Sequence, residues 1–197
     1  MGDTNVQPRV YLAGPEVFLP DAVEIGARKV AMCAAHGLSG LFPLDQSIDV
    51  SGLAPEAQAR AIALGNEQLM RSADALIANL TPFRGVSMDC GTAFEVGFMR
   101  ALGRPVFGYT TSGDDYRTRV DAFRANSGDW RDGDSTDCTI EDFGLAENLM
   151  IDVALRLSGH APVRAGLSRA AIGDLGAFER CLAAVAATIR KSAGSRT

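Results

Sequence analysis

Residues 78–106 read ANLTPFRGVSMDCGTAFEVGFMRALGRPV, and this stretch holds most of one α/β unit. The apolar run ALIANL over residues 75–80 predicts a buried strand, and a polar loop with Gly and Pro follows it. A helix is predicted over 91–102, because Gly103-Arg104-Pro105 ends it before the run VFGY, which predicts a strand over 104–110. The order strand, loop, helix, strand is typical of parallel sheets, in which ligands bind at the carboxyl ends of the strands.

The same alternation runs through the rest of the chain. Further strands are predicted at 9–13 and 41–44, and further helices at 21–35, 55–73, 145–157 and 175–191. The sequence therefore predicts a single α/β domain over residues 1–197, with a parallel sheet of about five strands and helices on both faces. Residues 111–139 are rich in Asp, Gly, Ser, Thr and Arg and predict a long loop, and residues 192–197 predict a frayed tail.

The composition restricts the classes of function. The 197 residues carry a formal net charge of −5 without a block of like charge, which argues against nucleic acid as a partner. No stretch approaches the about 20 apolar residues of a membrane span, and residues 1–6 lack the layout of a signal peptide. The four cysteines lack metal-binding spacing, so we expect reduced thiols, no metal and a cytoplasmic protein. No phosphate-loop or dinucleotide fingerprint is present, so no cofactor is expected.

Two acids, Asp89 and Glu95, lie at the predicted ligand edge of the sheet. Paired carboxylates in a cleft are the usual groups for chemistry at the anomeric carbon of a sugar. Glu95 also has a structural interpretation, because Thr92-Ala-Phe-Glu95 fits the capping box, in which the glutamate only accepts a backbone N–H. Its place beside the positive end of a helix would instead keep it ionised and suited to nucleophilic attack. Asp89 is either a helix cap or a group that transfers a proton.

Further candidates follow the first two strands. Tyr11 lies near the end of the first strand, where its hydroxyl would reach the ligand edge, and Phe18 just beyond could stack on a planar base. Asn66 falls on the apolar stripe of a helix, where its amide would bond either to a neighbouring loop or to a ligand. Asp45 and Gln46 directly follow the second predicted strand.

Together these residues resemble the nucleoside 2-deoxyribosyltransferase family. The resemblance rests on five segments in the family's order, which are VYLAGPEVF at 10–18, FPLD at 42–45, ALIANLTPFRG at 75–85, DCGTAFEVG at 89–97 and FGLAENLM at 143–150. It implies a flavodoxin-like or Rossmann-like sheet and an enzyme of nucleoside salvage that moves 2-deoxyribose between nucleobases. It also implies that no metal or organic cofactor is needed.

The resemblance further implies a role for each matching residue. Glu95 matches the nucleophile that attacks C1′ of a 2′-deoxynucleoside, Asp89 an acid that contacts the sugar and moves a proton, and Tyr11 a tyrosine that orients the nucleophile. Asn148 and Met150 match a pair that completes a neighbouring subunit's site, in which the asparagine binds the sugar 5′-hydroxyl. The resemblance therefore implies a dimer or an assembly of dimers. The remaining substrate-binding positions are Gly14, Phe18, Asp45, Gln46, Asn66, Arg84 and Gly91.

Two rival functions stay open at this point. A 2′-deoxynucleoside 5′-monophosphate N-glycosidase of the same fold would pass the sugar to water. Arg84 and Ser87 favour this hydrolase, whereas Glu16 in the first loop would repel its phosphate. The second rival is a non-catalytic nucleoside-sensing domain, against which the three candidate catalytic residues argue.

Overall fold

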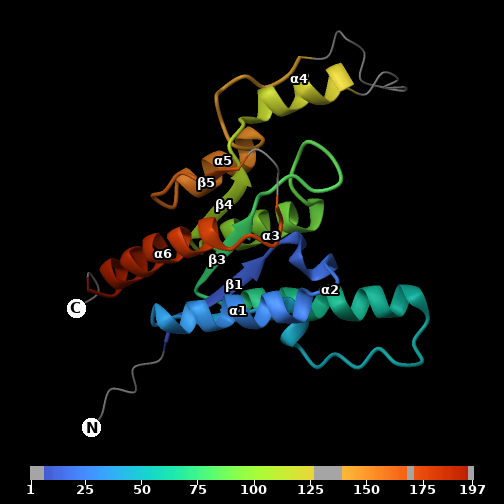
Figure 1. The fold of residues 1–197 in the computed structure, drawn as a ribbon. Helices are drawn as coiled ribbons and strands as arrows, with labels where there is room; N and C mark the ends of the chain where they lie inside the picture. The colour runs from blue at the N-terminus through green and yellow to red at the C-terminus, as the bar shows by residue number, and fades with distance from the viewer. Residues whose placement is uncertain (1–6, 127–138, 168–170, 195–197) are drawn as a thin grey trace.

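A five-stranded sheet forms the centre of the molecule (Figure 1). The computed structural model describes residues 7–126, 139–167 and 171–194. The strand order is β2-β1-β3-β4-β5, and all neighbouring strands are parallel. The strands are β1 (Arg9–Ala13), β2 (Ser39–Leu41), β3 (Ala75–Asn79), β4 (Val106–Ser112) and β5 (Val163–Leu167). The predicted α/β fold with a parallel sheet is confirmed.

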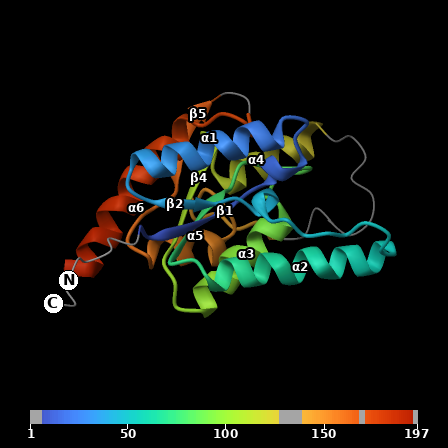
Figure 2. The same cartoon turned by 90° about the horizontal axis from the view of Figure 1, so that it is seen from below.

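Helices cover both faces of the sheet, because side chains alternate between its two sides along each strand. Val10 and Leu12 of β1 pack with residues of α1 (Ala22–Ala35) and α6 (Gly176–Gly194) in one core. Tyr11 and Ala13 point the other way and pack with α2 (Pro55–Arg71), α3 (Cys90–Ala101) and α5 (Leu149–Arg156). Figure 2 shows α1 on one side of the sheet and α2 and α3 on the other.

The strand order changes direction at β1, and this places the site. The chain passes from β1 to β2 on one side, and then to β3, β4 and β5 on the other. Parallel sheets form a crevice at such a switch point, outside the carboxyl ends of the strands. The short helix η1 (Pro15–Phe18) and the loop after β3 leave the sheet at this edge.

Three predicted boundaries are wrong in part. The second strand is Ser39–Leu41 rather than 41–44, since Pro43 has no N–H for the sheet and begins the short helix η2 (Pro43–Asp45). The predicted loop 111–139 contains the end of β4 and the helix α4 (Tyr116–Asn126), while residues 127–138 lie outside the described residues. Residues 192–194 of the predicted tail belong to α6, and 195–197 lie outside the described residues.

Two observations concern the cysteines and the helices of the described part of the chain. Cys33, Cys90 and Cys181 are free, and Cys138 lies outside the described residues. Within the described part of the chain, no helix is both long and apolar enough to cross a bilayer.

Candidate active site

Tyr11 and Glu95 meet where β1 and α3 pack against each other. The Tyr11 side chain is fully buried, and its hydroxyl donates a hydrogen bond of 2.5 Å to Glu95 Oε1. Glu95 lies in the second turn of α3, so its carboxylate is held from one side by the helix and from the other by the sheet. The structure thus brings together two of the three residues that the sequence analysis selected for catalysis.

The N-terminus of α3 is capped by Asp89 and not by Thr92. Asp89 Oδ2 accepts from the backbone N–H of Thr92 at 2.9 Å and from its hydroxyl at 3.2 Å. The capping-box interpretation of Glu95 is therefore wrong, because the helix begins three residues earlier than that motif requires and the carboxylate bonds to Tyr11 instead. Glu95 has no capping role, which leaves its carboxylate available for chemistry.

The pKa of Glu95 is raised to about 7. Burial is the largest cause, the Tyr11 hydrogen bond acts in the opposite direction, and the nearby charge of Asp89 raises the pKa further. Burial and the like charge of Asp89 thus oppose the ionised form of Glu95 that the sequence analysis expected beside the helix end. Tyr11 stays protonated, since burial and the Glu95 charge raise its pKa far above the usual value, and it remains a hydrogen-bond donor.

Phe18 and Arg84 come together through Phe83, which the sequence analysis did not select. The rings of Phe18 and Phe83 stack at 5.4 Å with an interplanar angle of 10°, and the Arg84 guanidinium lies 5.0 Å and 4.6 Å from the two ring centres. Arg84 has a φ of 56°, a left-handed conformation that is uncommon for a residue with a side chain. Phe18 is 54% exposed, so this stack presents an aromatic surface at the ligand edge.

Gln46 and Asn66 are also brought together. Gln46 Nε2 donates to Asn66 Oδ1 at 3.0 Å and to the Pro43 carbonyl at 3.3 Å. The structure therefore contains the bond to a neighbouring loop that was one of the two alternatives for Asn66. Asp45 lies at the end of η2 with an exposed side chain.

Gly14 lies over a buried polar cluster that the sequence analysis missed. Glu16 Oε1 accepts from Lys29 Nζ at 2.8 Å, the Tyr109 hydroxyl at 2.7 Å and Asn79 Nδ2 at 3.1 Å. Glu16 and Lys29 are both 0% exposed. A Cβ at position 14 would lie 1.9 Å from Glu16 Oε2, so only glycine permits this close approach. Four elements, η1, α1, β3 and β4, are joined under the first loop.

This cluster corrects one sequence argument. Burial raises the pKa of Glu16, but the Lys29 charge and the hydrogen bonds outweigh it and hold the pKa below its usual value. The Glu16 carboxylate is therefore ionised, neutralised by Lys29 and shielded from solvent. It cannot repel a phosphate at the loop mouth as the sequence analysis assumed. The signal in the sequence was Lys29 on the apolar face of a predicted helix.

Asn148 and Met150 lie at the start of α5. The Asn148 side chain caps this helix by accepting from Met150 N at 3.0 Å, and its amide donates to Glu141 Oε1 at 2.7 Å. Met150 is 71% exposed. Among the described residues, no hydrogen bond joins this pair to Glu95. Gly91 lies exposed in the first turn of α3, with Asp89 Oδ2 about 3.0 Å from where a Cβ would stand.

No group of three His, Cys, Asp or Glu side chains suited to a metal ion occurs within the described residues. The candidate site contains the carboxylates of Asp89 and Glu95 and the hydroxyl of Tyr11. It also contains the stacked rings of Phe18 and Phe83 with the Arg84 guanidinium. Such groups can attack an electrophilic carbon, transfer a proton and hold a planar ring.

Comparisons with known proteins bear on the family and the fold. The family model for nucleoside 2-deoxyribosyltransferase matches residues 10–150. A protein from Schizosaccharomyces pombe, described only as uncharacterized, is 34% identical over 168 residues, covering 77% of this chain and 79% of its own length. The structure of a 2-deoxyribosyltransferase from Leishmania mexicana is similar with a TM-score of 0.59 and 27% identity, covering 91% of this chain and 97% of that one.

A third relative shares the fold. A conserved protein from Enterococcus faecalis has a TM-score of 0.55 at 20% identity, over 91% of this chain and 99% of its own. The fold and site define an α/β protein with a buried tyrosine–glutamate pair at the switch point of its sheet. The chain belongs to the nucleoside 2-deoxyribosyltransferase family, as the sequence resemblance predicted.

Proposed function

We propose that this protein transfers a 2-deoxyribosyl group from one nucleobase to another through a covalent ester on Glu95. Family and fold support deoxyribosyltransferase-type activity. The single observation that carries the finer proposal is the bond of 2.5 Å between the Tyr11 hydroxyl and Glu95 Oε1. It fixes one carboxylate oxygen and leaves Oε2 to act on a substrate, which suits a nucleophile better than a structural residue.

In the first step, Glu95 Oε2 attacks C1′ of a 2′-deoxynucleoside. A carboxylate–C1′ bond forms while the C1′–N bond breaks, and its electron pair leaves with the base. The departing base takes up a proton from solvent by way of Asp89, which lies close enough to Glu95 for the two carboxylates to interact and whose Oδ1 is not used by the helix cap. The product is a deoxyribosyl ester and a free base.

In the second step, a nitrogen of the incoming base attacks C1′ of the ester. The C1′–N bond forms, the ester bond breaks, Glu95 regains its negative charge and Asp89 takes the proton of the new base. Two inversions at C1′ give net retention, as in a retaining glycosidase in which a base replaces water. Tyr11 keeps its proton throughout and steadies the carboxylate in both steps.

The aromatic stack and the amide pair supply the substrate contacts in this proposal. The base lies against Phe18, whose exposed ring offers a flat apolar surface, with Arg84, Asp45 and Gln46 around it. The sugar lies between Glu95 and Asp89, with its 5′-hydroxyl on Asn148 of a neighbouring copy. The protein is a homo-oligomer that acts in cytoplasmic nucleoside salvage, with 2′-deoxynucleosides and free nucleobases as its substrates.

One observation bears on the rival hydrolase of nucleoside 5′-monophosphates. The Ser87 hydroxyl, a candidate phosphate ligand, donates at 2.5 Å to the buried Glu147 carboxylate. The single hydroxyl proton of Ser87 is therefore engaged within the protein and is not offered to a phosphate. Glu16 no longer argues against a phosphate, so this bond of Ser87 is the structural observation that disfavours the hydrolase.

A base exchange tests the proposal. The protein is incubated with thymidine or 2′-deoxyinosine plus adenine, and the products are separated by chromatography. The expected product is 2′-deoxyadenosine, formed by the native protein and absent with Glu95→Ala. Release of free base without a new nucleoside would favour the hydrolase, and 2′-deoxynucleoside 5′-monophosphates would be tried next. Absence of both products would contradict the transferase and favour the sensing domain.

A further inference from the structure

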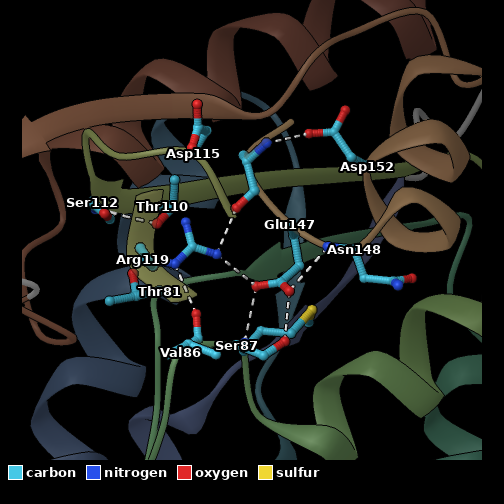
Figure 3. A network of polar contacts seen from close by, with 12 residues as sticks. Thr81, Val86, Ser87, Thr110, Ser112, Asp115, Arg119, Glu147, Asn148 and Asp152 are labelled. Atoms are coloured by element: carbon cyan, nitrogen blue, oxygen red, sulfur yellow. Dashed lines mark hydrogen bonds and ion pairs between the residues drawn. The ribbon is translucent and has the colours of Figure 1, made fainter. Parts of the chain in front are cut away.

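A buried charge pair, Arg119 and Glu147, joins three segments around the site (Figure 3). Arg119 on α4 is 9% exposed. Its guanidinium donates to the carbonyls of Val86 at 2.7 Å, Asp114 at 2.9 Å and Ala146 at 2.8 Å. It also reaches Glu147 Oε2 at 3.2 Å. One side chain thus ties α4 to the loop before Asp89 and to the turn before α5.

The carboxylate of Glu147 is 0% exposed and accepts hydrogen bonds on both of its oxygens. Oε1 accepts from the Ser87 hydroxyl at 2.5 Å and the Asn148 N–H at 3.0 Å. Oε2 accepts from the Met88 N–H at 3.0 Å and from Arg119. Met88, which precedes Asp89, and Asn148, which caps α5, therefore both bond to the Glu147 carboxylate. Figure 3 shows Asn148 beside Glu147.

The turn around Asn148 is fixed from a second side. Glu141 accepts from Asn148 Nδ2 at 2.7 Å and from Leu149 N at 2.8 Å, and Asp152 accepts from Ala146 N at 2.9 Å. Glu147 is the member of this set that also reaches the loop after β3. Glu147 and Arg119 therefore both connect the two segments.

Stability alone does not account for a buried ion pair. Taking two charges out of water is costly, and apolar residues of similar volume often stabilise a fold as well or better. Apolar groups, however, could not accept from the buried N–H of Met88 or the partly buried N–H of Asn148, or fix their positions by directed bonds. This pair instead fixes the position of the loop after β3 relative to the turn before α5.

We propose that Arg119 and Glu147 are positioning residues, which hold the loop that carries Asp89 and the turn that carries Asn148 in one fixed relation. The inference rests on the proposed function, because Asp89 acts there at the reacting carbon and Asn148 on the sugar 5′-hydroxyl. Neither Arg119 nor Glu147 touches the substrate. Both act through the residues next to them.

Kinetics with two substrates test the proposal. Base exchange is measured with a 2′-deoxynucleoside and with the matching 2′,5′-dideoxynucleoside, for the native protein, Glu147→Gln and Arg119→Lys. The amide introduced by Glu147→Gln would offer a single oxygen to donors that now share two. We expect kcat to fall about tenfold with both substrates, since the Asp89 loop shifts, and KM to rise about tenfold only for the substrate with the 5′-hydroxyl.

The control is Arg117→Lys, two residues away on the same helix. Arg117 forms an exposed pair with Asp121 at 2.7 Å, and exposed pairs contribute little. We expect native kinetics for this variant. An equal rise of KM for both substrates, or native kinetics in Glu147→Gln, would overturn the proposal. The expectation is the same whether Asn148 completes its own site or a neighbour's, because every copy carries the substitution.

A second measurement is independent of activity. Amide hydrogen exchange is followed at Met88 and Asn148 in Ser87→Ala, which removes one donor to Glu147 and leaves the buried pair in place. We expect both amides to exchange faster together, because both bond to the freed carboxylate. Unchanged exchange at either amide would overturn the linkage. A native protein with no base exchange but with this joint response would contradict the proposed function and leave the linkage standing.

Discussion

At the scale of single residues, the account depends on the protonation of Glu95. Its pKa is raised to about 7, so the carboxyl group titrates in the neutral pH range rather than below it. A less buried glutamate would be fully ionised but also better solvated. Burial therefore gives a carboxylate that is poorly solvated once ionised, which raises its reactivity toward C1′.

The pH dependence of activity follows from this pKa. We expect kcat/KM for base exchange to rise with pH through about 7 and then level, because only the ionised Glu95 attacks. In Tyr11→Phe the hydrogen bond that lowers the Glu95 pKa is lost, so the rise should move to higher pH. The loss of activity should be about 10- to 100-fold near pH 6 and smaller at pH 9. A rise at the same pH in both proteins would contradict the role of Tyr11.

The residues of the site could be predicted from sequence to different degrees. Tyr11, Asp89 and Glu95 follow from their places at strand and helix ends, where a parallel sheet gathers side chains. Phe83 was missed because a loop aromatic has no periodicity to mark it, and its stack on Phe18 exists only once two loops meet. The raised pKa of Glu95 was missed because burial is a tertiary property.

At the scale of elements, the Glu16–Lys29 pair joins the first loop to the sheet. Lys29 Nζ lies 2.8 Å from Glu16 Oε1 and 4.8 Å from the ring centre of Phe178 on α6. Its charge has no contact with solvent. The pair therefore fixes η1 over the ends of β3 and β4, where Asn79 and Tyr109 donate to the same oxygen.

Removal of one partner should be costly. We expect Lys29→Met to lower the free energy of unfolding by about 3–5 kcal/mol, because it leaves a buried carboxylate without a cation. The double variant Lys29→Met/Glu16→Gln should recover part of this loss. Urea denaturation measures both, with Arg71→Met as control, since Arg71 and Glu67 form an exposed pair. Equal stabilities of Lys29→Met and Arg71→Met would contradict the role of the pair.

Helix α4 shows why one element was mistaken for a loop. Its apolar residues Tyr116, Val120 and Phe123 recur at helical spacing, but the stripe is short and stands among Arg and Asp residues in a polar stretch of the sequence. The helix is also held by Arg119, whose guanidinium bonds to three carbonyls and Glu147, and by Asp115, which accepts from Thr118 N at 2.7 Å. The composition of the segment outweighed this short stripe in the sequence analysis, and the polar anchors exist only in the folded chain.

At the scale of the whole molecule, the order of strands and helices was predictable because the apolar runs are short, strong and separated by Gly and Pro. The edge strands were the weakest part. β5 contains Arg164 and Gly166 and was not assigned, and β2 was placed two residues late. Edge strands have only one neighbour, so their sequences carry less of the apolar signal.

An exposed apolar face on α5 and the neighbouring α3 supports the proposed homo-oligomer. Met150, Val153 and Leu157 are 71%, 40% and 65% exposed and recur at helical spacing, and Phe94 on α3 is 59% exposed. An exposed apolar face of this kind is typical of an interaction site. The presence of Met150 on it agrees with the neighbouring-site role that the resemblance implies.

Substitution on this face should change the assembly. We expect the native protein to sediment as a dimer or larger, and Val153→Glu to sediment as a monomer with base exchange reduced at least about tenfold, because a buried interfacial charge is unfavourable. Val23→Glu is the control, since Val23 is 77% exposed on α1, on the other side of the sheet. A native protein that sediments as a monomer with full activity would contradict the proposed shared site.

The central claim is that Glu95 carries the sugar between two bases. The most direct measurement is mass spectrometry after incubation with a 2′-fluoro-arabinosyl nucleoside, since fluorine at C2′ slows the breakdown of a glycosyl ester. The account predicts a mass gain of one fluorinated sugar on the tryptic peptide 85–100, located at Glu95 by fragmentation and absent in Glu95→Gln. Release of the base without a mass gain, or a gain at Asp89, would contradict it.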